Sequence, residues 1–298
     1  MGGYNINTLE KTKQILKKNN IKANKRFGQN FLIDDNILEN IVETANVLKN
    51  DLVIEIGPGL GNLTNYLIKC SKHVMLIEID TNMIDILKNR FEKDLNYTLI
   101  REDVLNIDID EEIEKIENKI NQKFENVKVV ANLPYYITTP IIFKLLQDSK
   151  RVSEITVMVQ KEVAQRMVAN KNSKAYGILT LMVEYLSDAK IKMEVPNTSF
   201  IPSPEVTSAV VRLVKSKKYV LDKEEEKILY KLIHSSFAQR RKKIINSLES
   251  TKFLDMSKEE LKKLLELCKL KETTRAQELD LQEYINIVKN IKKYQANL

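Results

Sequence analysis

Residues 52–64 read LVIEIGPGLGNLT, and three of the seven glycines of the chain fall within five residues of this stretch. The apolar run 52–56 predicts a buried strand, and the apolar spacing of residues 63–70 predicts a helix. Glycines at such a strand-to-helix turn allow the backbone to approach a ligand closely. The spacing is GxGxG, whereas dinucleotide-binding proteins carry GxGxxG. The stretch therefore predicts either a ligand-binding loop that is not specific for NAD or a tight turn with no ligand.

The pattern around this stretch predicts an α/β fold with a doubly wound parallel sheet. Helical spacing separates the apolar runs, and alternation of this kind is typical of βαβ units. Asp34 is a candidate N-cap for a helix before the first strand. Two later runs are expected to close the sheet as a hairpin. The expected strands are 52–56, 74–79, 98–103, 127–132, 155–160, 189–195 and 207–214.

A change in composition divides the chain. Residues 215–227, KSKKYVLDKEEEK, are polar and charged, and the sequence beyond them has helical periodicity without strand signals. We expect one domain over residues 1–217, which includes a basic N-terminal arm, and a small all-helical domain over residues 218–298.

The net charge of +7 is unevenly distributed. Residues 1–30 hold seven basic and one acidic residue (+6), residues 31–150 hold thirteen and twenty-one (−8), and residues 151–298 hold twenty-eight and nineteen (+9). Basic flanks around an acidic centre favour a polyanionic partner. A lysine-rich composition that keeps the protein soluble explains the charge distribution equally simply.

Several classes of protein are disfavoured by composition. The chain has no apolar run of eighteen residues and no secretory signal, so we expect a cytoplasmic protein without a membrane segment. Its two cysteines are far apart and it has only two histidines, which argues against a disulfide framework and against a metal site.

Two acidic residues indicate which ligand the glycine stretch would bind. Glu78 ends the second predicted strand, where a carboxylate can accept both hydroxyls of a ribose. Asp103 ends the third, where it can accept from the amine of an adenine ring. Together with the glycines they predict an adenosine pocket. A cationic sulfonium cofactor suits the acidic central segment better than a pyrophosphate does.

The sequence NLPY, residues 132–135, follows the fourth predicted strand and should face the same crevice. The exocyclic nitrogen of adenine is a poor nucleophile because its lone pair is delocalised into the ring. The side-chain oxygen of Asn132 and the carbonyl of Leu133 could accept from its N–H groups and localise that lone pair toward a methyl donor. Pro134 fixes the backbone, and the Tyr135 ring offers a face for stacking.

The chain resembles the ribosomal RNA adenine N6,N6-dimethyltransferases of the small-subunit type. The likeness extends from about Lys25 to Ile287. Seven motifs match in order: KRFGQNFL (25–32), EIGPGLGNLT (55–64), EID (78–80), ED (102–103), NLPYYITTPI (132–141), PSPEVTSAVV (202–211) and FAQRRKK (237–243). The resemblance implies a Rossmann-like class I methyltransferase sheet, S-adenosylmethionine as the cofactor, and in-line methyl transfer to two adjacent adenosines near the 3′ end of 16S rRNA.

The resemblance also implies roles for particular residues. The cofactor would be held by Asn30, Leu32, Gly57, Gly59, Glu78, Asp103 and Asn132. The flipped adenine would be held by Asn132, Leu133, Pro134 and Tyr135, with Phe200 as a candidate second aromatic ring; a core position is the alternative for Phe200.

Basic residues at both ends are expected to contact RNA. Lys25 and Arg26 lie in the N-terminal motif. If residues 237–248 form one helix, Lys242 and Lys243 face outward with Arg240 at the border, and Arg241 lies on the apolar face as a paired, structural arginine. The chain departs from the family pattern at Lys243, Ile245 and Glu184.

Three other functions compete with this interpretation. The first is a 23S rRNA adenine dimethyltransferase of the macrolide-resistance type, which usually carries NIPY. The second is a non-catalytic RNA-binding assembly factor, and the third is a NAD-dependent oxidoreductase. We expect a monomer that acts on 16S rRNA within the small ribosomal subunit.

Overall fold

The computed structural model describes residues 7–21, 29–216 and 218–296. The chain divides into two compact units. The first comprises Met1–Ala164 and Asp188–Lys215, and the second comprises Gln165–Ser187 and Ser216–Leu298.

The first unit is built on a seven-stranded sheet with the order β4-β3-β2-β5-β6-β9-β7. Strands β4, β3, β2, β5 and β6 run parallel to their neighbours, and β9 is antiparallel to β6. The predicted doubly wound sheet is therefore confirmed. Its strands are β2 (Leu52–Ile56), β3 (His73–Glu78), β4 (Tyr97–Arg101), β5 (Val127–Asn132), β6 (Val152–Gln160), β7 (Ser187–Val195) and β9 (Ser208–Lys215).

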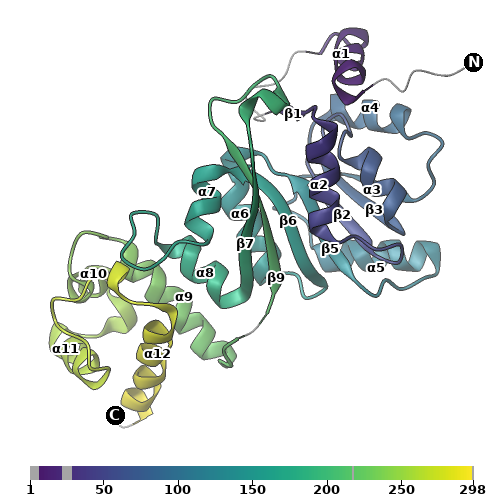
Figure 1. Ribbon diagram of the computed structural model, residues 1–298. Coiled ribbons are helices and arrows are strands. Elements are labelled where there is room, and N and C mark those ends of the chain that lie inside the picture. The colour runs from purple at the N-terminus through teal and green to yellow at the C-terminus, as the bar shows by residue number, and fades with distance from the viewer. Residues whose placement is uncertain (1–6, 22–28, 217, 297–298) are drawn as a thin grey trace, which may run out of the picture. The chain divides into compact units, whose positions relative to one another are not determined.

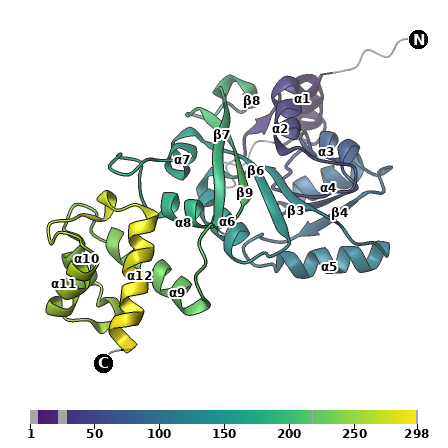
Figure 2. The ribbon, with the colours of Figure 1, turned by 60° about the horizontal axis from the view of Figure 1, so that its bottom comes forward.

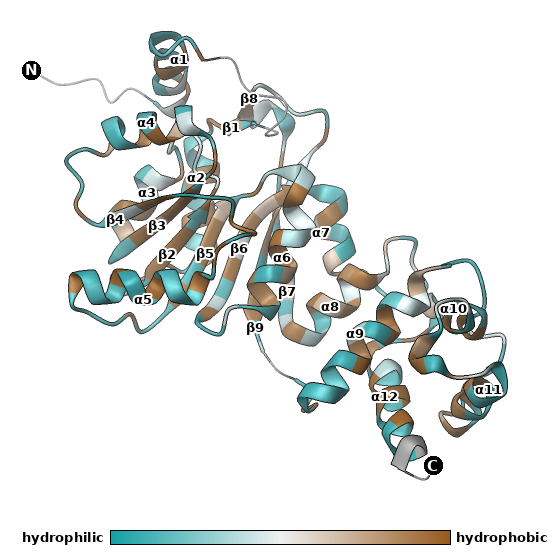
Figure 3. Ribbon diagram, turned by 180° about the vertical axis from the view of Figure 1, so that it is seen from behind, coloured by the Kyte–Doolittle hydropathy of each residue, from teal (hydrophilic) through white to brown (hydrophobic). Residues whose placement is uncertain are grey.

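Helices cover both faces of this sheet. Helix α2 lies in front of the strands in Figure 1, and α6 lies in front of them in the reverse view of Figure 3. Because both faces are covered, all five residues of β2 are buried and the strand is a nearly continuous apolar run. The helices of this part of the chain are α2 (Asp35–Ala45), α3 (Thr64–Cys70), α4 (Thr81–Arg90), α5 (Ile109–Ile120), α6 (Thr138–Gln147) and α7 (Lys161–Met167).

Side-chain caps fix where several helices begin. Asp34 caps α2, as expected, and accepts hydrogen bonds from the backbone N–H groups of Asn36 at 3.1 Å and Ile37 at 3.3 Å. Asp108 caps α5 in the same way. A cap of this kind satisfies N–H groups that have no partner within the helix.

The order of the strands creates a switch point beside β2. The chain leaves β2 for β3 on one side and later returns to β5 on the other. The helices that follow the two strands diverge there, which opens a crevice at the carboxyl ends of β2 and β5. The glycine stretch and Asn132 both lie at this edge.

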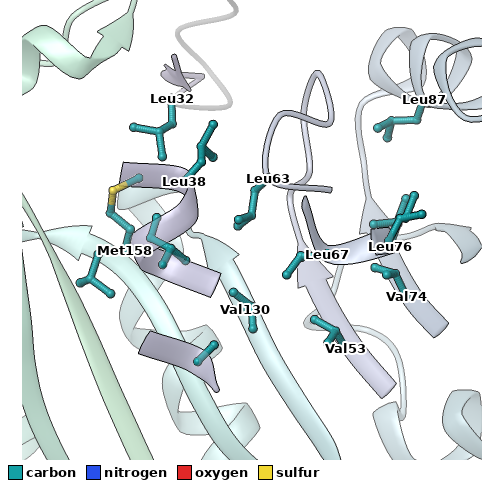
Figure 4. Packing of buried hydrophobic residues seen from close by; sticks show 14 of the residues in the cluster. Leu32, Leu38, Val53, Leu63, Leu67, Val74, Leu76, Leu87, Val130 and Met158 are labelled. Atoms are coloured by element: carbon teal, nitrogen blue, oxygen red, sulfur yellow. The ribbon is translucent and has the colours of Figure 1, made fainter. Parts of the chain in front are cut away.

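The N-terminal part of the first unit contains elements that the sequence pattern did not predict. Helix α1 (Thr8–Lys18) precedes a two-stranded sheet of β1 (Phe31–Leu32) and β8 (Phe200–Ile201). Leu32 pairs with Phe200 in this sheet. Figure 4 shows Leu32 above Leu38 of α2 and near Met158 of β6, so β1 packs on the main hydrophobic core.

The second unit is helical. Figure 2 shows α9 to α12 gathered together. Its helices are α8 (Ile178–Leu186), α9 (Lys223–Phe237), α10 (Ile244–Ser250), α11 (Lys258–Leu267) and α12 (Leu281–Ala296). Short 3-10 helices complete the fold: η2 (Tyr135–Ile137), η3 (Asn197–Ser199), η4 (Phe253–Asp255) and η5 (Ala276–Glu278).

The division of the chain differs from a single boundary at residue 217. Residues 165–187, which we placed in the first domain, group with the C-terminal helices. Tyr185 of α8 donates a hydrogen bond to Glu226 of α9 at 2.9 Å, and its ring packs edge-on against Tyr230 at 6.1 Å between centroids. Tyr176 likewise donates to the Leu279 carbonyl at 2.8 Å.

Within the described residues, no helix has both the length and the apolar content needed to cross a bilayer.

Candidate active site

A cavity opens at the switch point of the sheet. It is lined by β1, by the glycine stretch, and by the residues that follow β3, β4 and β5, and it contains about 1040 Å³ of empty space, part of it open to solvent. Ten of the residues singled out in the sequence line it together: Asn30, Leu32, Gly57, Gly59, Glu78, Asp103, Asn132, Leu133, Pro134 and Tyr135.

The glycine stretch, of which Gly57 and Gly59 line this cavity, has a conformation that requires glycine. Gly57, Gly59 and Gly61 have φ angles of +67°, +55° and +79°, a region that residues with a Cβ rarely adopt. A Cβ on Gly61 would also lie 2.6 Å from a ring carbon of Phe91. A Cβ on Gly59 would lie 3.1 Å from the Phe31 ring, so β1 closes directly onto this loop.

Glu78 joins the end of β3 to the glycine loop. One carboxylate oxygen accepts from the N–H groups of Ile79 and Asp80, both at 2.9 Å, and the other accepts from Gly59 N–H at 3.1 Å. Burial raises the pKa of Glu78 above its usual value, and these backbone donors oppose that rise. Since a carboxylate offers about four acceptor positions, Glu78 can still accept from a bound hydroxyl.

Asp103 lies in the turn after β4. Its Oδ1 atom accepts from the N–H of Leu105 at 2.9 Å, which fixes the carboxylate at the edge of the cavity. The side chain is half-buried, so it remains accessible to a ligand within the cavity.

Asn132, the last residue of β5, is oriented by the segment that precedes β1. Its Nδ2 donates to the carbonyl oxygen of Asn30 at 3.1 Å. Because a carbonyl can only accept, the amide nitrogen must face Asn30, which leaves Oδ1 as an acceptor for another group. The next residue, Leu133, donates its N–H to the carbonyl of Met158 at 3.1 Å and is thereby held against β6.

The two tyrosines of the NLPYY motif differ in environment. The hydroxyl of Tyr135 is 2.6 Å from Ser208 Oγ of β9, and burial raises the pKa of this phenol, which is therefore neutral. Tyr136 also lines the cavity but is 57% exposed.

Glu55 is a residue of the cavity whose chemistry we did not predict. It lies in β2, is buried, and accepts from the Thr64 hydroxyl at 2.5 Å. Burial, reinforced by the nearby Glu78 charge, raises the pKa of Glu55 to about 8. The available signal was an acidic residue inside an otherwise apolar strand, since such a residue is rarely buried without a specific partner.

Phe200, the candidate second aromatic ring, is 3% exposed in the hydrophobic core. Phe200 is not among the described residues that line the cavity, whereas Leu32, with which it pairs in the two-stranded sheet, is one of them. Its role toward a flipped base remains a prediction. Lys25 and Arg26 lie outside the described residues.

The basic residues of the second unit are arranged differently from the expectation. Residues 237–248 are not one helix: α9 ends at Phe237 and α10 begins at Ile244. Arg241 is consequently exposed in the intervening turn, and its assignment to an apolar face was wrong. Lys242 and Lys243 are also exposed, whereas Arg240 is half-buried and donates to the Ser173 carbonyl at 3.1 Å.

The residues of the cavity fit the predicted cofactor. Gly57 and Gly59 give a ligand direct access to backbone, Glu78 retains acceptor capacity for ribose hydroxyls, and the acidic groups suit a ligand that carries a positive charge. The sheet order and the cavity at its carboxyl edge define an S-adenosylmethionine-dependent class I methyltransferase.

Comparison with known proteins gives the family. The family model described as "Ribosomal RNA adenine dimethylase" matches residues 20–293, so the chain belongs to the ribosomal RNA adenine dimethylase family. A protein of Lactococcus lactis named "Ribosomal RNA small subunit methyltransferase A" is 42% identical over 282 residues, which cover 95% of this chain and 94% of that protein. A protein of the same name from Alkaliphilus oremlandii is 42% identical over 97% of this chain and 98% of its own length.

Solved structures have the same fold. A dimethyladenosine transferase from Plasmodium falciparum has a TM-score of 0.71 at 27% identity, over 89% of this chain and 98% of that one. The 23S rRNA methyltransferase ErmE has a TM-score of 0.64 at 22% identity, over 88% of this chain and all of the other, and this likeness concerns the fold alone.

Proposed function

We propose that this enzyme dimethylates N6 of two adjacent adenosines in the 3′-terminal hairpin of 16S rRNA during biogenesis of the small ribosomal subunit. The observation that carries the proposal is the orientation of Asn132, whose amide oxygen is left as an acceptor in a cavity suited to an adenosine cofactor. Full-length relatives named for the small-subunit RNA support the choice of substrate.

Each side of the cavity has a distinct part in binding the cofactor. Glu78 accepts from the ribose hydroxyls and Asp103 from the adenine amine. Gly57 and Gly59 present backbone to the methionine portion, and Leu32 of β1 and the preceding Asn30 close the site. Bound S-adenosylmethionine supplies an electrophilic methyl group.

The NLPY motif holds the target base. Asn132 Oδ1 and the Leu133 carbonyl accept from the N6 amine and localise its lone pair. Pro134, with φ of −58° and ψ of 128°, fixes the extended backbone that presents this carbonyl. The hydrogen bond to Ser208 holds the Tyr135 ring as a stacking surface. Positioning supplies most of the rate, because the nitrogen sheds its proton readily once it is alkylated.

RNA contacts are assigned to the exposed turn between α9 and α10. Lys242 and Lys243 are exposed there and can reach phosphate groups. Arg240 combines one contact to the Ser173 carbonyl with further N–H donors that remain available in its guanidinium group. Lys25 and Arg26 are assigned to RNA from the sequence alone. We further propose that the enzyme acts as a cytoplasmic monomer without a metal ion.

Nucleoside mass analysis tests the substrate. The protein is incubated with S-adenosylmethionine and small ribosomal subunits that lack the modification, with unmodified 23S rRNA in parallel. We expect N6,N6-dimethyladenosine in the small subunit alone. Its appearance in 23S rRNA alone would indicate the resistance-type reaction, and its absence from both would indicate a non-catalytic assembly factor.

A further inference from the structure

Asn62, which directly follows Gly61, is a buried junction between three segments. Its Nδ2 donates to Thr12 Oγ1 of α1 at 2.9 Å and to the Leu32 carbonyl of β1 at 2.8 Å. Its Oδ1 accepts from Arg90 of α4 at 2.9 Å. Both amide hydrogens and the amide oxygen are therefore engaged, and the side chain is only 6% exposed.

Thr12 is the residue that α1 contributes to this junction. It lies in the middle of α1 and its exposure is 0%. The helix is also held by apolar contacts, since Ile15 and Leu16 pack against a cluster that contains Phe31 of β1 and Leu60 of the glycine loop. Helix α1 thus lies against the two segments that close the cofactor cavity.

A continuous set of contacts leads from Thr12 to the reacting end of the cavity. Asn62 holds the Leu32 carbonyl, and two residues earlier the Asn30 carbonyl orients Asn132. On the other side, Phe31 rests against Gly59, whose N–H donates to Glu78. A displacement of Asn62 would therefore shift Glu78 and Gly59, which are expected to bind the cofactor, and the side-chain amide of Asn132.

We propose that Thr12 is a positioning residue: through its hydrogen bond to Asn62 it holds the glycine loop and residues 30–32 in the geometry that binds S-adenosylmethionine and aims Asn132. The inference rests on the proposed function of the cavity. Helix α1 contributes none of the lining residues described for the cavity, so the proposal adds a residue outside the cavity to those that determine its geometry.

The test compares Thr12→Val with Thr12→Ser. Valine keeps the volume of threonine but leaves one N–H of buried Asn62 without an acceptor, a loss that typically changes an equilibrium about 5- to 100-fold. We expect Thr12→Val to weaken S-adenosylmethionine binding, measured by calorimetry, by about this factor. The variant should also have a lower kcat and an unchanged KM for RNA. Thr12→Ser keeps the hydroxyl and should bind the cofactor nearly as the wild type does.

Further variants separate positioning from folding. Thr12→Ala and Thr12→Ser both lose the methyl group and differ in the hydroxyl, so they give the same comparison if the valine variant does not fold. Lys13→Ala changes an exposed side chain of the same helix and should leave binding unchanged. The double variant of Thr12→Val and Asn62→Ala should bind no more weakly than Asn62→Ala alone, because Asn62→Ala already lacks the hydrogen bond between residues 12 and 62.

Wild-type cofactor affinity for Thr12→Val would overturn the proposal, as would an equal loss in Thr12→Ser. A rise in KM for RNA with unchanged cofactor binding would also overturn it and assign α1 to the substrate. A wild-type protein that binds no S-adenosylmethionine would refute the proposed cavity itself, which is a separate outcome.

Discussion

The side-chain nitrogen of Asn132 donates to the backbone carbonyl of Asn30 at 3.1 Å, across 102 residues of sequence. This contact determines which end of the amide faces the cavity. An asparagine in any other orientation would present N–H groups to an amine that itself donates, and it could not activate adenine.

Asn132→Ala should abolish most of the activity, whereas most cofactor contacts, those of Glu78, Asp103 and the glycine loop, remain. We expect kcat to fall about 10²- to 10³-fold, the usual loss when one preorganised hydrogen-bonding group is removed. S-adenosylmethionine affinity, measured by calorimetry, should change far less. Since a non-catalytic assembly role would survive this substitution, subunit assembly in the variant distinguishes the two functions.

Glu78→Gln should weaken cofactor binding about 10- to 100-fold, because a neutral amide replaces a charged acceptor. In the wild type, affinity should also fall as the pH is lowered. The pKa of Glu78 is raised by burial, so protonation begins at a higher pH than for an exposed carboxyl group. Calorimetry across this acidic range should show a dependence that the glutamine variant lacks. Equal dependence in both proteins would contradict the assignment of Glu78 to the ribose.

Glu55→Gln should change the dependence of stability on pH. With a pKa raised from 4.5 to about 8, Glu55 is protonated in the folded protein but ionised in the unfolded chain between these values. The unfolded state then binds fewer protons, so the free energy of unfolding falls as the pH rises through this window. The full shift corresponds to an upper bound of about 5 kcal/mol.

Urea unfolding at several pH values from 5 to 9 measures this effect. Glutamine resembles the neutral acid and cannot ionise, so the variant should lose less stability than the wild type toward alkaline pH. Parallel curves for the two proteins would show that Glu55 is ionised in the folded state, in which case its interactions with Arg90 and Thr64 outweigh burial.

Tyr136→Ala should impair RNA binding. An exposed ring at a nucleotide-binding cavity is suited to stacking, and the loss of such a surface costs about 1–3 kcal/mol per base. We expect KM for RNA to rise with little change in cofactor affinity, and Tyr136→Phe to behave as the wild type. Leu95→Ala is a suitable control, because Leu95 is 93% exposed and is not among the described lining residues. A phenylalanine variant as weak as the alanine variant would point to the hydroxyl group instead.

Replacing both Lys242 and Lys243 by alanine should reduce the salt dependence of RNA binding. Each lost phosphate contact lowers the slope of log K against log salt by about 0.7 to 0.9. Lys231→Ala combined with Lys263→Ala, two exposed lysines elsewhere in the helical unit, provides a control of equal charge. If the control pair lowers the slope as much, the effect comes from net charge and not from the turn at residues 238–243.

The fold and most of the cavity could be predicted from the sequence because their signals are local. A buried strand is a short apolar run, and the chain order alone places the residues that follow parallel strands at one edge of the sheet. Residues 52–56 and 127–132 were predicted with the bounds that the structure gives them. For the same reason Gly57, Glu78, Asp103 and Asn132 could be assigned to one site.

Local periodicity failed where backbone partners come from distant segments. Residues 237–248 carry apolar side chains at helical spacing, yet the helix ends at Phe237. The N–H of Ile244 donates to the Thr274 carbonyl at 2.8 Å, and Lys243 forms a bridge with Arg275. These contacts replace the hydrogen bonds that would continue the helix, and they turn Arg241 toward solvent.

The sequence by itself determined where the buried strands lie along the chain, the glycine loop and the chemical groups at the edge of the sheet, since these depend on neighbours in the chain. The tertiary structure alone decided the orientation of Asn132, the raised pKa of Glu55, the burial of Phe200 and the docking of Thr12 on Asn62. Each of these depends on a partner or a desolvated environment supplied by a distant segment, and side-chain direction and pKa respond to such surroundings rather than to residue type.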